Sequence, residues 1–274
     1  MRISGFVAGF TFTLLVTVPV WAADIGQVDA CAVSGPNGKI AAQGGIWDAD
    51  DFDSDGQFKG VGSFSMPLGC TLGLQVDAGA ATYGDVDAVG AGAHLFLRDP
   101  ASYLLGVHGT YENWDINGAG SQDVWRIGAE AELYAGMFSL EGWAGLQDTD
   151  FSGADVFAKL TAAVYLTTDL RLDAGVRFSD DFTYGAVSAE WQLPDMPLSL
   201  TAEGRIGEDD YSSVTVGAKF YFGSEQKPLI GRHREDDPVD GLFDFIGAAG
   251  NAVVPACENT NDGNCCDQTS CEGT

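Results

Sequence analysis

The sequence predicts an all-β protein: a single transmembrane antiparallel up-and-down β-barrel of about twelve strands, followed by a Cys-containing C-terminal tail. Apolar or small residues alternate with polar ones in successive stretches, and the charges of a stretch fall on one side of the alternation. In the last stretch, Val214, Val216 and Phe220 share one side and Lys219 takes the other, because side chains alternate faces along a strand. A soluble sandwich would place its charges outside and its large apolar side chains within. The uncharged faces found here are typical of strands that face lipid.

The twelve predicted strands are separated by two kinds of connection. The strands are residues 39–47, 57–66, 71–83, 88–98, 102–113, 123–135, 138–147, 155–167, 170–179, 183–193, 198–206 and 212–222. Every second connection, such as 136–137 or 168–169, is tight and rich in the Gly, Pro and Asp that close hairpins. The intervening connections, such as 48–56 and 114–122, are longer or more acidic. Short periplasmic turns and longer outer loops are the asymmetry of outer-membrane barrels, so both chain ends are expected in the periplasm.

The chain divides into four predicted segments. Residues 1–22 combine Arg2, an apolar run over 6–20 and small residues at Val20 and Ala22, which indicates a secretory signal peptide. A membrane-spanning helix is the alternative, but the uncharged run is short for the roughly 20 residues that such a span needs. Residues 23–38 are predicted as a periplasmic arm, 39–223 as the barrel and 224–274 as a periplasmic tail.

The charge balance excludes one class of partner. The net charge of -27 arises from 40 acidic and 13 basic residues, which argues against nucleic acid as a ligand. The apolar and aromatic content is that of a folded chain, so the acidity does not indicate disorder. Acidic loops at the mouth predict a weak cation preference if the barrel is open, since their field attracts cations over about 8 Å at physiological salt.

Charged and histidine side chains on the inward parity form the predicted pore lining. They are Lys59, Asp77, His94, Arg98, His108, Glu112, Arg126, Glu130, Glu132, Glu141, Lys159, Arg171, Asp173, Arg177, Glu190, Glu203, Arg205 and Lys219. Acidic and basic members nearly balance, so the lumen is expected to be close to neutral. Barrels of about eight strands are filled by side chains and those of about 16 to 18 hold water, and twelve lies between them. Inward glycines such as Gly79 and Gly90 favour an open pore.

Catalytic and metal sites receive weaker support. His94 and His108 share the inward parity with Glu112, but no Ser stands in a recognisable nucleophile context, so neither a catalytic residue nor a cofactor is predicted. The run Asp51, Asp53, Asp55 matches the opening of a calcium-binding EF-hand loop. Its twelfth position is glycine rather than the bidentate Glu, which leaves a weak calcium candidate and predicts no other metal site.

The six cysteines predict disulfides, because the chain is expected in an oxidising compartment. Cys31 precedes the first strand and Cys70 lies in the turn after the second, so both are expected at the same rim and are predicted to pair. The remaining four are predicted to form two bridges within the tail: Cys257, Cys265, Cys266 and Cys271. A Cys-rich metal site is the alternative, but paired Cys-x-x-Cys units are missing.

The tail contains one predicted helix. Asp237 and Pro238 are suited to its beginning. Its apolar face would consist of Leu242, Phe243, Ile246 and Ala249. That face is expected to be buried against the membrane, against a partner, or inside the barrel as a plug. The sequence does not distinguish these three locations. The preceding basic cluster, residues 232–234, is predicted to be a solvated linker.

Over residues 39–222 the chain resembles the porin-like outer-membrane β-barrel proteins of Gram-negative bacteria, on the basis of its hairpin pattern, loop asymmetry, signal peptide and aromatic-ended last strand. In that family the last strand usually ends the chain, whereas here a tail follows. The resemblance implies an outer-membrane location with both termini periplasmic, contact with lipid and lipopolysaccharide, and insertion by the barrel-assembly machinery. The predicted function is passive diffusion of small hydrophilic solutes. A closed structural or adhesive surface barrel, acting through its acidic loops, is the alternative; an enzyme is not predicted, and the oligomeric state does not follow from the sequence.

Overall fold

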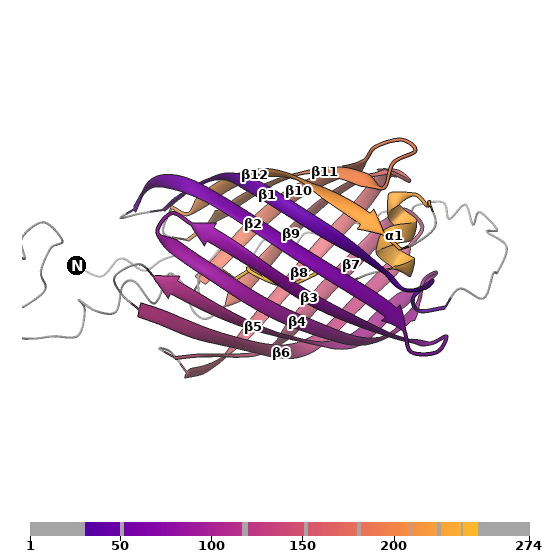
Figure 1. The fold of residues 1–274 in the computed structure, drawn as a ribbon, viewed down its shortest axis with the longest axis horizontal. Helices are drawn as coiled ribbons and strands as arrows, with labels where there is room; N and C mark the ends of the chain where they lie inside the picture. The colour runs from indigo at the N-terminus through magenta and orange to yellow at the C-terminus, as the bar shows by residue number, and fades with distance from the viewer. Residues whose placement is uncertain are drawn as a thin grey trace, which may run out of the picture.

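The computed structural model describes residues 31–49, 52–116, 120–150, 153–179, 182–208, 210–223, 226–236 and 238–245. These residues form a closed barrel of antiparallel strands in which each strand pairs with its neighbours in sequence and β1 pairs with β12 (Figure 1). The strands are β1 (Asn37–Ala49), β2 (Phe52–Pro67), β3 (Leu72–Tyr83), β4 (Val86–Asp99), β5 (Tyr103–Ile116), β6 (Gly120–Ala135), β7 (Phe138–Thr149), β8 (Gly153–Thr167), β9 (Leu170–Ser179), β10 (Phe182–Gln192), β11 (Leu198–Gly207) and β12 (Ser212–Phe222). The predicted fold, its twelve strands and its up-and-down order are therefore confirmed.

Most differences from the predicted boundaries occur at the ends of the strands next to the longer connections. There β2 begins at Phe52 rather than at residue 57, and β6 begins at Gly120 rather than at residue 123. The β1–β2 hairpin continues to pair beyond a register shift between Trp47 and Ala49. Strand pairing therefore continues through polar and acidic sequence where the apolar alternation that marks a strand has already ended.

The two faces of the barrel have the opposite polarity to a soluble protein. Apolar side chains point outward, as in Ile127 (62 % exposed) and Ile206 (73 % exposed), while the preceding arginines in the chain, Arg126 and Arg205, are 2 % and 6 % exposed. This alternation confirms the inward and outward parities read from the sequence. An apolar exterior around a charged interior is the arrangement of a barrel that spans a membrane.

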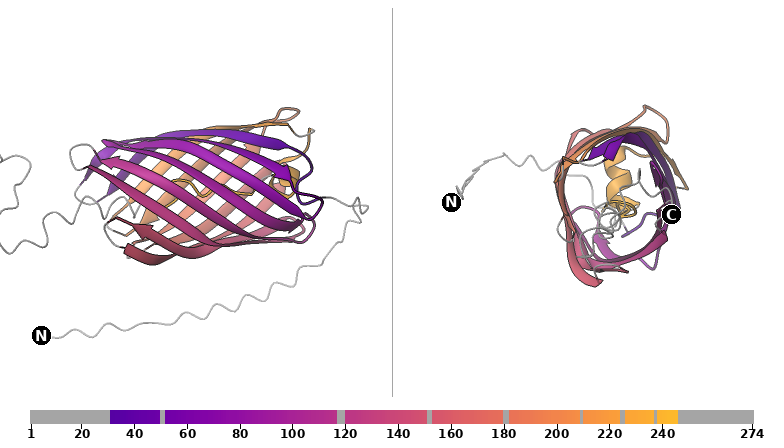
Figure 2. Two further views of the ribbon diagram at one scale, coloured as in Figure 1. Left: turned by 60° about the horizontal axis from the view of Figure 1, so that its bottom comes forward. Right: turned by 90° about the vertical axis from the view of Figure 1, so that its left-hand side faces the viewer.

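The chain continues beyond β12 into a short helix, α1 (Leu229–Glu235), at the barrel end that carries the tight turns (Figures 1 and 2). The amide of Leu229 donates to Asp169 Oδ1 at 3.2 Å, and the amide of Ile230 donates to the Thr168 carbonyl at 3.0 Å. These two bonds fix the start of α1 on the turn between β8 and β9. The end-on view in Figure 2 shows α1 inside the outline of the barrel.

Residues 238–245, which we call the plug segment, follow α1 and lie within the barrel. Leu242, Phe243 and Phe245 are at most 1 % exposed. The helix predicted to begin at Asp237 is wrong for the described residues, because the plug segment is irregular and Phe243 has a φ of 59°; the helix lies upstream instead. Of the three locations considered for the apolar part of the tail, residues 238–245 occupy the interior of the barrel.

One predicted disulfide is confirmed. Cys31 and Cys70 are bonded, with their Cα atoms 4.3 Å apart, and the amide of Ala32 donates to the Cys70 carbonyl at 2.6 Å. The bridge joins the arm before β1 to the turn between β2 and β3. Several predictions lie outside the described residues: the signal peptide, the four tail cysteines, the positions 246 and 249, and the side chains of Asp51 and Asp53. Within the described residues, no helix is long and apolar enough to cross a membrane.

Candidate functional site: the charged lumen and its plug

The predicted pore-lining side chains all lie on the inward parity of the barrel. Five of them are half-buried: Lys59, Lys159, Asp173, Glu203 and Lys219. The others are buried: Asp77, His94, Arg98, His108, Glu112, Arg126, Glu130, Glu132, Glu141, Arg171, Arg177, Glu190 and Arg205. Because the plug segment occupies part of the space between them, their role as the lining of an open pore stays a prediction.

The strongest charge contacts of the plug segment belong to Asp244. Its carboxylate lies 2.5 Å from Lys159 Nζ on β8, 3.8 Å from Lys59 Nζ on β2 and 3.6 Å from Arg205 on β11. Arg177 on β9 adds a further favourable charge interaction with it. Asp244 is only 5 % exposed. Its carboxylate is the counter-ion of four basic side chains, which come from four different strands.

Lumen side chains also bind the backbone of the plug segment. Lys39 Nζ donates to the Pro238 carbonyl at 2.9 Å, and the Phe243 amide donates to Glu112 Oε1 at 2.9 Å. Glu112 is itself held by Arg126, whose Nη1 lies 3.1 Å from the same oxygen. An irregular segment cannot pair its own peptide groups, so these side chains supply hydrogen bonds that water would otherwise make.

Aromatic side chains surround the apolar end of the plug segment. The ring centroid of Phe243 is 5.9 Å from that of Trp114. The ring of Phe245 is 5.8 Å from Trp143 and 5.3 Å from Phe157, in edge-to-face geometry. Such pairs add to the stabilisation that apolar burial provides. The barrel interior therefore contains a small apolar cradle within its otherwise polar lining.

Inward glycines make room for this packing. A Cβ added at Gly79 would come within 3.1 Å of Phe243, and one added at Gly90 within 3.2 Å of Leu242. In the plug segment itself, a Cβ on Gly241 would lie 2.6 Å from the ring of His108. The space that these small residues were expected to leave for a pore is thus taken, in this structure, by the chain's own tail.

The basic cluster of α1 is not a solvated linker, and that prediction is wrong. Arg232 is 2 % exposed and its Nε donates to Gln192 Oε1 at 2.9 Å. Arg234 donates to two backbone carbonyls at the β6–β7 turn, each at 2.8 Å. His233 lies between Tyr165 Oη, at 2.9 Å, and the Glu190 carboxylate, at 3.6 Å. The partners of all three side chains belong to the barrel strands and turns, so these contacts form only once that end of the barrel has assembled.

His233 is the titratable group of this docking surface. Burial lowers the pKa of His233 below its ordinary value, and the nearby Glu190 carboxylate opposes but does not outweigh that effect. Arg171 and Lys219 also act to lower the pKa of His233. The docked helix therefore favours the neutral imidazole.

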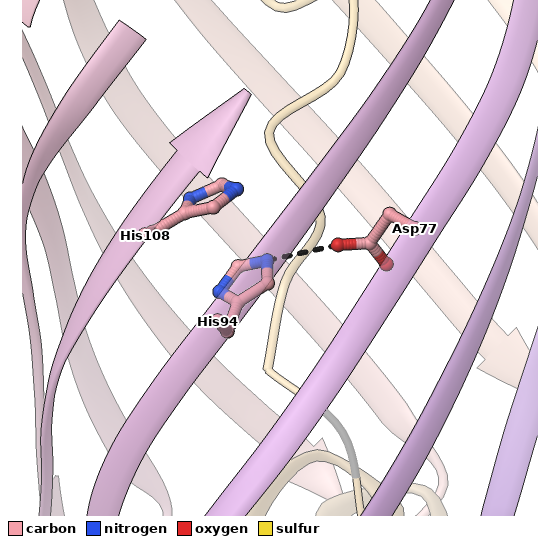
Figure 3. A group of neighbouring side chains, drawn as sticks. All are labelled: Asp77, His94 and His108. Atoms are coloured by element: carbon pink, nitrogen blue, oxygen red, sulfur yellow. Dashed lines mark ion pairs between the residues drawn. The ribbon is translucent and has the colours of Figure 1, made fainter. Parts of the chain in front are cut away.

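A second polar cluster lies on β3, β4, β5 and β6. His94 Nε2 is 3.0 Å from Asp77 Oδ2 (Figure 3). His94 Nδ1 is 2.7 Å from Glu130 Oε2. The ring of His108 stacks on that of His94 with centroids 3.5 Å apart, and its other face stacks on Trp143 at 4.1 Å. The partners of His94 are carboxylates rather than a hydroxyl or thiol, so the cluster lacks the nucleophile–base hydrogen bond of covalent catalysis.

The space left beside the plug segment is small. A cavity of about 120 Å³ lies between it and the strands, and charged side chains such as Lys59, Glu141, Arg171 and Glu190 line it. That volume holds several water molecules.

Comparisons with known proteins identify the fold. No family model and no curated protein matches the chain. Among solved structures, KdgM porin in complex with disordered oligogalacturonate matches with a TM-score of 0.53 at 9 % identity, over 68 % of this chain and 99 % of that chain. KdgM porin alone gives a TM-score of 0.51 with the same identity and coverage. Outer membrane phospholipase A from Escherichia coli also matches, with a TM-score of 0.47 at 11 % identity over 69 % of this chain and 90 % of that chain. At such identities the likeness to the KdgM structures shows a shared barrel fold.

Proposed function

We propose that this protein is an outer-membrane channel for small hydrophilic solutes, and that its own C-terminal tail closes the lumen in the state described here. The observation that carries the proposal is the plug segment: an irregular stretch of chain lies among charged side chains inside a complete barrel. The porin fold of the KdgM structures supports the channel assignment.

The barrel does not need the plug segment to close its sheet. Each strand has both of its neighbours, including β1 against β12, and the backbone hydrogen bonds are therefore complete without the tail. Most groups that hold the plug segment are charged or amide side chains, which water can solvate after the plug leaves. Release of residues 226–245 is expected to give a hydrated lumen within an intact barrel.

Charge selectivity follows from where the charges lie. A weak cation preference is proposed for the full chain, because the acidic excess of the protein lies outside the nearly balanced lumen. Loss of the tail would leave four basic side chains around the former position of Asp244 without that counter-ion: Lys59, Lys159, Arg177 and Arg205. Removal of the tail is therefore expected to shift selectivity toward anions.

The barrel's orientation and partners are also part of the proposal. We place the tight turns, α1 and both ends of the chain on the periplasmic side, and the longer acidic connections at the cell surface, where divalent cations can bridge them to lipopolysaccharide. Lipid contacts the apolar exterior, and insertion is assigned to the barrel-assembly machinery.

Solute release from proteoliposomes tests the proposal. Vesicles of outer-membrane lipid composition, loaded with neutral, anionic or cationic sugars, would contain either the full chain or a chain truncated before Ser224. Fast release from the truncated barrel, with slower release from the full chain, supports a plugged channel. The filled lumen also favours the alternative of a permanently closed surface barrel. Release from neither form, with folding verified by heat-modifiable migration, would favour that alternative.

A further inference from the structure

The cluster of Asp77, His94 and His108 has the composition of a metal site. One ligand atom from each residue can be chosen so that all three lie within 4.8 Å of one another, and all three residues are buried. Ligand atoms about 2.0 to 2.2 Å from a tetrahedral zinc ion are about 3.3 to 3.6 Å apart. Side-chain movements of about 1 Å would therefore bring the three atoms onto one ion.

The contacts between protein groups leave His108 unexplained. Its side chain is 1 % exposed, and its Nε2 atom is buried with no hydrogen-bond partner. A buried ring nitrogen without a partner loses its hydration for no compensating bond. The centroid of the neighbouring His94 ring is 3.5 Å away, so an ion held by both rings would satisfy this atom once the rings tilt from their stacked arrangement and their in-plane lone pairs converge.

His94 has the second contact that metal-binding histidines usually show. Its Nε2 faces Asp77 at 3.0 Å while its Nδ1 faces Glu130 at 2.7 Å. A carboxylate on the far nitrogen fixes the orientation of a ligating imidazole and raises its basicity. Asp77 and Glu130 together carry two negative charges, which a divalent cation would neutralise after it replaces the proton shared by His94 and Asp77.

Space for a further ligand lies beside His108. A cavity of about 30 Å³ is lined by His108, Glu130 and Trp143 on the barrel and by Val239, Asp240 and Gly241 on the tail. It is large enough for one water molecule. The tail residues cover this side of the cluster, so access to the site depends on movement of the plug segment.

We infer that Asp77, His94 and His108 bind a divalent transition-metal ion within the lumen, with Glu130 as the positioning residue of His94. Two imidazoles and a carboxylate favour Zn²⁺ and its neighbours in the first transition row over Ca²⁺ or Mg²⁺, which prefer oxygen ligands alone. The bound ion cross-links β3, β4 and β5 inside the barrel. Neither the channel proposal nor the weak calcium candidate in the β1–β2 loop includes this site.

An ordinary ion pair is the competing explanation. A protonated His94 between Asp77 and Glu130 accounts for three of the four residues without any metal. It leaves the His108 Nε2 atom unsatisfied, and it places a cation directly against the His108 ring. The two explanations differ in what happens when His108 is replaced.

Cobalt titration of the refolded full chain, prepared without a histidine tag, distinguishes them. Co²⁺ reports nitrogen ligation through its visible absorption, and Zn²⁺ should displace it. The chain has only three histidines, so H233N is a matched control outside the cluster. We expect stoichiometric binding by the wild type and by H233N, loss of binding in H108A, and binding about 10- to 100-fold weaker in E130Q. Zn²⁺ should raise the thermal unfolding temperature of the wild type but not of H108A.

The tail cysteines require a second background, because free thiolates also bind Co²⁺. The same titration is therefore repeated with Cys257, Cys265, Cys266 and Cys271 replaced by serine, and retention of the signal supports the site. The inference is overturned if the wild type binds no metal, if H108A binds as tightly as H233N, or if binding disappears with the four cysteines. The Nε2 atom that H108A removes makes no hydrogen bond in the structure, and heat-modifiable migration verifies that the variant folds.

Discussion

Replacement of Asp244 by Asn should release the plug segment without unfolding the barrel. The carboxylate is the counter-ion of Lys59, Lys159 and Arg205, at 3.8, 2.5 and 3.6 Å. Asn keeps the size of the side chain and some of its hydrogen bonds but removes the charge. The barrel strands retain all their pairing, so the change acts on the docking equilibrium of the tail.

The expected size of this effect follows from the burial of the pair. Removal of one member of a buried ion pair costs about 3 to 5 kcal/mol, because the other member remains buried without its partner. The side chains of Lys59 and Lys159 are 19 % and 10 % exposed, so water partly solvates them and the lower figure applies. At about 1.4 kcal/mol per tenfold change, the ratio of undocked to docked tail should rise by roughly 100-fold.

Limited proteolysis measures that ratio. A protease that cuts after large apolar residues should cleave at Leu242, Phe243 or Phe245 only when the plug segment is undocked, and its rate then follows the undocked population. D240N is the matched control, because Asp240 is a half-buried carboxylate of the same segment that makes no ion pair within the described part of the chain. Equal cleavage rates for wild type, D244N and D240N would refute the anchoring role of Asp244.

Three further predictions concern the tail and the arm. G241V should also undock the tail, because its Cβ would meet His108 at 2.6 Å; the assay is the same proteolysis, and a wild-type rate would contradict the packing described. Docking should weaken as pH falls below about 6.5, by up to about 1.4 kcal/mol per pH unit, since the lowered pKa of docked His233 lets the released helix bind more protons. H233Q should remove this slope, and a persistent slope would assign it to another group. C31S/C70S should lose up to about 4 kcal/mol of unfolding free energy in urea for a bridge with a sequence separation of 39; an unchanged midpoint would show that the bridge constrains nothing.

The strands were predictable because lipid imposes a strict rule on one face of each strand. A charge on the outward side is costly, so the alternation around residues such as Arg126 and Arg205 carries a clear signal. The Cys31–Cys70 bridge followed from the same topology, since the parity and the turns placed both cysteines at one rim. Lys39 shares the inward parity with the predicted lining residues and was within reach of the same reasoning.

The plug segment could not be located from sequence because its contacts depend on the assembled lumen. Asp244 lies in a short acidic and apolar stretch with no periodic pattern, and its partners come from strands far away in the chain. From the sequence, Arg232 and Arg234 were predicted to be solvated. Their partners are a side-chain amide and backbone carbonyls, and such groups occur in every loop, so the sequence does not mark which of them an arginine will bind. The pairing of His94 with His108 was visible as shared parity on adjacent strands, but their stacking and the Asp77 and Glu130 contacts needed the register of four strands.

Single-channel conductance in a planar bilayer tests the central claim most directly, with the full chain, D244N and the chain truncated before Ser224 measured in the same lipid. The account predicts rare or brief openings for the full chain, a larger open fraction for D244N, and stable steps with a shift toward anion selectivity for the truncated barrel. Silence from the truncated barrel, with its folding verified, would contradict a channel that the tail closes; stable openings of the full chain equal to those of the truncated form would contradict the plug.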